Sequence, residues 1–145
     1  MQNPGQIEAR VEARHRTLLF LWFGILMSMS LFLGLTLYVP SNNPEPNTTL
    51  SFALIGAAFM VVILSVLIKL RIVHRAIEKR DGAMLQTGYV VSFALCEAAA
   101  LWGLIDHFVT GSSYYYFSFA LGLLGMLVHF PKKDHLRAAT AWTAG

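Results

Sequence analysis

The chain has 145 residues, of which 56% are hydrophobic and only 13% are charged, with a formal net charge of +3. A soluble domain of this composition would be unusual, and four long apolar runs indicate an all-α integral membrane protein instead. These runs occupy most of residues 1–145, so we expect a single membrane domain with no soluble catalytic domain. The small net positive charge reflects basic residues that set the orientation of the chain in the membrane. We expect no nucleic-acid partner. The single cysteine excludes a disulfide framework.

The apolar runs predict four membrane spans packed as a four-helix bundle. At about 1.5 Å per residue, each run is long enough, or nearly so, to cross about 30 Å of hydrocarbon. We expect the spans at Leu18–Val39, Leu50–Leu70, Leu85–Val109 and Tyr114–Phe130.

The polar segments between the runs have distinct expected structures. Ile7–Arg16 is charged and favours helix, so it should extend the first span as a helical stub. Prolines in Pro40–Thr49 predict an extended outer loop. Arg71–Gly82 should continue the second helix and end in a turn, whereas Pro131 should stop the fourth span. We expect the Ala-rich tail that follows to be partly disordered.

Basic residues fix the expected orientation. When the loops are assigned alternately to two faces, all eleven Lys and Arg residues fall on one face. Lys and Arg in short loops mark the cytoplasmic side, so both termini and the Arg71–Met84 loop should be cytoplasmic. We expect a bacterial inner membrane. Membrane lipid is one expected partner, because cations beside the bilayer attract anionic headgroups.

Glu97 is the only carboxylate at the centre of an expected span. A charge at that depth costs several kcal/mol on insertion scales, so such residues are usually paired, protonated or functional. Hydroxyls such as Ser28, Ser30 or Ser65, or a group on another subunit, could pair with it. Three roles remain open: a contact between helices, a proton- or cation-binding carboxyl, and a contact with a cofactor or lipid.

Small residues mark one face of the third span and suit close helix packing: Ser92, Cys96, Ala99 and Gly103. Glu97 lies about 100° round the helix from Cys96 and therefore at the edge of this packing face. It should face a neighbouring subunit or lipid. That position favours assembly with other membrane subunits or with further copies of the chain.

Asp106 and His107 form an adjacent polar pair near the outer end of the third span. They are either interfacial residues at a helix end or an entry or exit point for protons. The other histidines (His15, His74, His129 and His135) fall at or beyond the cytoplasmic edge. Because no two histidines or cysteines stand three or four residues apart, we expect no metal site. We also expect no bound cofactor and no catalytic group.

Leu85–Ile105, with its Leu85-Gln-Thr lead and its acid among alanines, resembles the carboxylate helix of rotary ATP synthase c-subunits (proteolipids). The resemblance implies that Glu97 is the ion-binding carboxylate of an oligomeric ring. The chain departs from the family in the second span, where a single glycine, Gly56, stands in place of dense glycine repeats.

Three functions are compatible with these features. The first is a non-catalytic subunit or oligomeric component of a larger membrane assembly. The second is a proton- or cation-translocating protein that uses Glu97, with Asp106 or His107 near the outer mouth. The least favoured is a small membrane enzyme that acts on lipid or quinone at the histidine-rich cytoplasmic edge.

Overall fold

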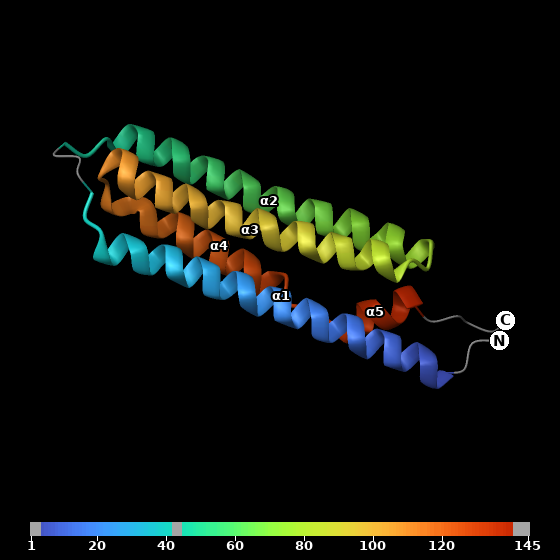
Figure 1. Ribbon diagram of the computed structural model, residues 1–145. Helices are drawn as coiled ribbons and strands as arrows, with labels where there is room; N and C mark the ends of the chain where they lie inside the picture. The colour runs from blue at the N-terminus through green and yellow to red at the C-terminus, as the bar shows by residue number, and fades with distance from the viewer. Residues whose placement is uncertain (1–3, 42–44, 141–145) are drawn as a thin grey trace.

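The computed structural model describes residues 4–41 and 45–140, and every regular element within these ranges is helical (Figure 1). In chain order, the elements are α1 (Pro4–Tyr38), α2 (Thr48–Glu78), α3 (Gly82–Thr110), the 3-10 turn η1 (Ser113–Tyr115), α4 (Tyr116–Val128) and α5 (Lys133–Thr140).

Three of these helices, α1, α2 and α3, are each long and apolar enough to cross a membrane. This property is that of an integral membrane protein. All three extend beyond the expected spans: α1 takes in the charged stub, and α2 continues to Glu78. The fourth apolar segment, Ser113–Val128, meets the same criterion only together with α5, from which it is bent by 50°.

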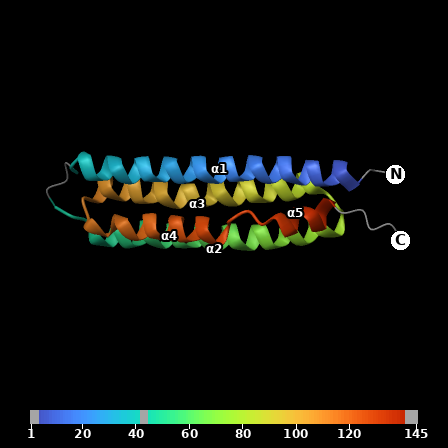
Figure 2. The same ribbon diagram turned by 90° about the horizontal axis from the view of Figure 1, so that it is seen from below.

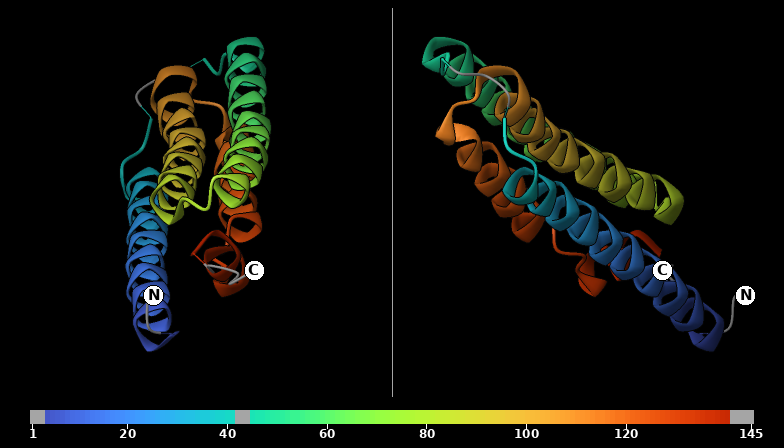
Figure 3. Two further views of the ribbon diagram at one scale, coloured as in Figure 1. Left: turned by 90° about the vertical axis from the view of Figure 1, so that its right-hand side faces the viewer. Right: turned by 60° about the vertical axis from the view of Figure 1, so that its left-hand side comes forward.

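Helix α3 is the central helix of the molecule. It contacts α1, α2, α4 and α5, whereas α1 and α2 lie on opposite sides of it (Figure 3). In the most apolar stretch of each helix, 44% of the residues are buried in α3, but only 11% in α1 and 17% in α2. The outer faces of α1 and α2 are therefore mostly apolar and exposed, as expected of helices that face lipid.

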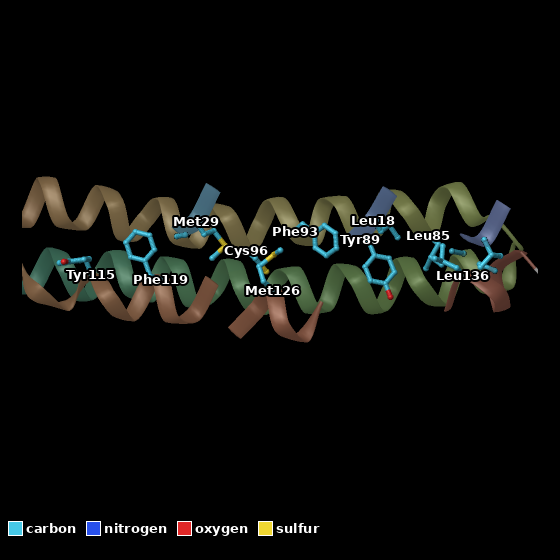
Figure 4. Close-up of a cluster of buried hydrophobic side chains, with 14 residues drawn as sticks. Leu18, Met29, Leu85, Tyr89, Phe93, Cys96, Tyr115, Phe119, Met126 and Leu136 are labelled. Atoms are coloured by element: carbon cyan, nitrogen blue, oxygen red, sulfur yellow. The ribbon is translucent and has the colours of Figure 1, made fainter. Parts of the chain in front are cut away.

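The buried apolar side chains form a single file along α3 (Figure 4). Tyr115 and Phe119 lie at one end of the file, Met29, Cys96 and Met126 near its middle, and Leu85 and Leu136 at the other end. Each helix thus contributes only a narrow stripe to the core.

Side chains and one glycine define the helix ends. Asp81 accepts hydrogen bonds from the backbone N–H groups of Ala83 (2.9 Å) and Met84 (3.0 Å), which caps the start of α3. Asn47 caps α2 in the same way through Leu50 N (3.0 Å). Gly111 ends α3 with φ 63°, a left-handed conformation that glycine adopts without strain.

Helix α4 ends at Val128, two residues before the expected end of the fourth span. Pro131 accounts for the break, because it has no N–H and disfavours helix in the residue before it. Side chains from other helices satisfy carbonyls at the break. Trp22 Nε1 donates to Met126 O (2.8 Å), and Lys69 Nζ donates to Val128 O (3.2 Å).

Lys133–Thr140, the first part of the tail that we expected to be partly disordered, forms α5. The short helix follows a brief non-helical stretch after α4 (Figure 2). It contacts α1 and lies beside the first part of that helix (Figure 1). Leu136 and Ala139, three residues apart, are buried. Two ion pairs, Arg137–Glu8 (2.6 Å) and Lys133–Glu12 (2.7 Å), join α5 to α1. The rest of the expected tail, residues 141–145, lies outside the described residues.

Candidate functional site

Glu97 lies at the seam between α3 and α1 and is half-buried. Ser28 on α1 donates a 2.6 Å hydrogen bond from its hydroxyl to Glu97 Oε1. Of the three hydroxyls considered from the sequence, Ser28 is the partner. Ser30 donates to Leu26 O on its own helix, and Ser65 lies against His129.

The face of α3 that carries Glu97 is exposed on the side away from α1. Val90, Leu101 and Phe108 lie within about 40° of Glu97 around the helix, and all three are exposed. The carboxyl group therefore stands at the rim of the α1–α3 contact, between a hydroxyl on one side and an exposed apolar strip on the other.

Asp106 belongs to a second, fully buried polar cluster. Ser51 near the start of α2 donates to Asp106 Oδ2 (2.7 Å), and Thr110 donates to Asp106 Oδ1 (2.7 Å). Thr110 in turn accepts from the backbone N–H of Ser112 (3.1 Å), and its carbonyl accepts from that of Asn47 (2.9 Å). The cluster ties the start of α2 to the end of α3.

His107 ties the end of α1 to the same end of α3. Its Nε2 lies 2.8 Å from the carbonyl oxygen of Val39. A carbonyl oxygen only accepts, so Nε2 carries the proton in this contact. The ring also makes an edge contact with Tyr115 of η1, with ring centres 4.7 Å apart. Asp106 and His107 are therefore both engaged in joining helix ends.

Glu97 and Asp106 do not form one site. Nine residues of α-helix separate them by about 13 Å along the axis and by about 180° around it. Their hydroxyl partners accordingly come from different helices, Ser28 on α1 and Ser51 on α2. The central carboxyl and the outer acid are therefore two separate polar sites.

The small-residue face of α3 is buried throughout, at Ser92, Cys96, Ala99 and Gly103. Ser92 faces α2, where its hydroxyl lies 3.4 Å from Ser65 O. Cys96 faces two glycines of α4: a Cβ added at Gly122 would lie 2.8 Å from Cys96 O, and one added at Gly125 would lie 2.7 Å from Cys96 Sγ. This face therefore brings α3 and α4 into close contact.

A third polar cluster, not expected from the sequence, surrounds His129. His129 is fully buried, and its Nε2 lies 2.8 Å from Ser65 Oγ. Ser65 Oγ also lies 3.7 Å from Cys96 Sγ. Nδ1 of His129 is buried without a hydrogen-bond partner in the described part of the chain. Helical spacing could have indicated its burial, because His129 follows the buried Gly125 by four residues and the buried Met126 by three.

Within residues 4–41 and 45–140, no three His, Cys, Asp or Glu side chains gather in a way that could hold a metal ion. No family model matches the chain, and comparison with curated proteins and with solved structures gives no match either.

Proposed function

We propose that the chain is a non-catalytic component of a larger membrane assembly, bound either to other membrane subunits or to further copies of itself. It would cross a bacterial inner membrane four times, with both termini and the α2–α3 connection in the cytoplasm. The positions of the basic residues support this orientation. The start of α1 and the end of α5 lie at the same end of the molecule as the α2–α3 connection (Figure 1).

The half-buried carboxyl of Glu97 carries the proposal. Glu97 lies at the edge of the α1–α3 contact, beside the exposed side chain of Leu101. In a chain without a neighbour, part of this polar side chain would contact lipid hydrocarbon. Polar side chains within membranes usually face protein or water because exposure to lipid is costly. A helix of a neighbouring chain packed on this strip would remove that cost. The resemblance of Leu85–Ile105 to ring-forming c-subunits is consistent with such a neighbour.

Site-specific photo-crosslinking in the native membrane tests this proposal. A photoreactive amino acid at Leu101, beside Glu97, should give a crosslinked product larger than one chain. Leu64 on the outer face of α2 is a matched control, since it is exposed and apolar and lies on a different helix. Equal crosslinking to protein from both positions, or crosslinking to lipid alone at Leu101, would contradict the proposal.

A second candidate, translocation of protons or cations at Glu97, has one specific observation in its favour. The Ser28 hydroxyl donates a 2.6 Å hydrogen bond to the carboxyl, so the side chain already has one fixed polar partner. For this function, Glu97→Gln should abolish ion flux into liposomes, and Ser28→Ala should reduce it. Absence of flux with the unaltered chain would exclude this function.

A further inference from the structure

Two lysines lie near Tyr89: Lys69 on α2, and Lys132 in the non-helical stretch between α4 and α5. The ammonium group of Lys69 on α2 lies 4.9 Å from the centre of the Tyr89 ring. The backbone N–H of Lys132 points to Tyr89 Oη at 3.5 Å. The two lysines therefore lie close together although they come from different parts of the chain, and their positive charges act on each other.

The surroundings do not cancel this positive charge. His135 lies 2.9 Å from Tyr89 Oη through Nδ1. Its pKa is lowered, first by burial and then by the charges of Lys69 and Lys132, with Asp134 acting in the opposite direction. His129 and Cys96 are buried and carry no carboxylate to this place. Within the described part of the chain, two carboxylates lie near the cluster: Asp134, and Glu12, which forms a 2.7 Å ion pair with Lys133 at the start of α5. Together Lys69, Lys132 and Lys133 outnumber them.

The start of α5 adds hydrogen-bond donors at the same place. Helix α5 begins at Lys133, directly after Lys132. The first N–H groups of a helix have no partner within it, and they favour a bound anion such as phosphate. Lys132 is exposed, and Lys69 is partly exposed with one of its three N–H donors directed at Val128 O (3.2 Å), so an anion can reach both side chains.

An apolar surface adjoins the two lysines on the membrane side. Helices α2 and α4 are in contact, and each exposes large apolar side chains near Lys69: Leu70, Leu127 and Val128. A cationic cluster at the end of an exposed apolar surface matches a lipid, whose charged headgroup is joined to hydrocarbon chains. A free anion would use only the cationic part.

We propose that Lys69, Lys132 and the first turn of α5 bind the phosphate group of an anionic membrane lipid. The acyl chains of the lipid would lie along the exposed apolar surface of α2 and α4. This site is separate from the Glu97 rim and does not depend on the proposed assembly role, only on placement of the chain in a membrane.

Native mass spectrometry of the purified full chain in mild detergent tests the site. The chain should retain phosphatidylglycerol more strongly than the zwitterionic phosphatidylcholine. Because one basic residue near an anionic surface contributes about 1 kcal/mol, Lys132→Gln should reduce retention about fivefold. Combining it with Lys69→Gln should reduce retention further. Lys79→Gln, which removes the same charge from an exposed position at the end of α2, should leave retention unchanged.

Two results would overturn the proposal. One is equal loss of phosphatidylglycerol with Lys132→Gln and Lys79→Gln, which would indicate attraction by overall charge. The other is complete displacement of the lipid by millimolar inorganic phosphate, which would indicate a site for free anions. Circular dichroism checks that Lys132→Gln keeps the fold, and its exposed side chain makes a folding defect unexpected.

Discussion

Ser28 on α1 and Glu97 on α3 form a 2.6 Å hydrogen bond at the centre of the apolar part of the molecule. The bond joins two helices and uses one oxygen of a carboxyl group that stands at the rim of their contact. An acid in this position is paired on one side and exposed on the other. That asymmetry distinguishes Glu97 from Asp106, whose cluster is closed on all sides.

Removal of Asp106 should destabilise the fold. Asp106→Ala would leave the buried Ser51 hydroxyl without its acceptor, and an unsatisfied buried group costs about 1–3 kcal/mol. The Thr110 hydroxyl would keep the backbone carbonyl of residue 106 (2.8 Å) as an acceptor. We expect a loss of about 2 kcal/mol or more in the free energy of unfolding, measured by denaturation in detergent. Asp134→Ala, at an exposed position, should have a much smaller effect.

A double-mutant cycle separates the energy of the Ser51–Asp106 hydrogen bond from the other effects of each substitution on stability. If the bond is formed, Ser51→Ala should cost less in the Asp106→Ala background than in the unaltered chain, because the two residues are in direct contact. Strictly additive losses would show that the two side chains do not interact.

Close packing between α3 and α4 should make Gly122 intolerant of even a methyl group. The Cβ of Gly122→Ala would lie 2.8 Å from the backbone oxygen of Cys96, so the helices would have to separate. Overpacking of this kind typically costs about 1–3 kcal/mol. Gly56→Ala is the matched control, because nothing lies within 4 Å of its added Cβ.

The Gly56→Ala control also has an expected sign. On an exposed part of α2, alanine favours helix by up to about 1 kcal/mol over glycine. Thermal denaturation should therefore show Gly122→Ala less stable, and Gly56→Ala equal to or more stable than the unaltered chain. Equal effects of the two substitutions would contradict the close α3–α4 contact.

Acid should release α5 from α1. The hydrogen bond and charge of Lys133 lower the pKa of Glu12 below its ordinary value of 4.5. A carboxyl group with a lowered pKa in the folded state stabilises fully above the pKa of the unfolded state, and this stabilisation is lost as the pH falls through the folded pKa. Distances between spin labels at the exposed positions Arg10 and Ala138 should therefore lengthen below about pH 4.5.

Two controls test whether the Lys133–Glu12 ion pair causes the change in distance. Lys133→Gln should give the longer distance already at neutral pH, and salt should weaken the unaltered pair, because exposed ion pairs are screened. A distance that is constant from pH 7 to pH 3 would show that the apolar contacts of Leu136 hold α5 without help from the ion pairs.

Hydrophobicity alone predicted the helical class and the approximate places of the three long helices, because runs such as Leu50–Leu70 have no other stable structure. The end of α4 and the existence of α5 were harder to predict. Pro131 indicated that the helix would end, but not at which residue. Leu136 and Ala139 are too short an apolar pattern to predict a helix unless the surface that they cover is known.

The polar contacts between helices were even harder to predict from the sequence. Helical spacing placed Glu97 at the edge of the packing face, and Ser28 was among the expected partners. The Ser51–Asp106 and Ser65–His129 contacts could not be predicted in this way, because they depend on which helices are neighbours and on how far each is shifted along the other.

Extraction from the native membrane in mild detergent, followed by native mass spectrometry of whatever contains this chain, tests the central claim most directly. The account predicts a complex larger than one chain, with other polypeptides or further copies, that dissociates when Leu101 beside Glu97 is replaced by a bulky tryptophan. A single chain that carries only lipid, and whose mass state Leu101→Trp does not change, would contradict it.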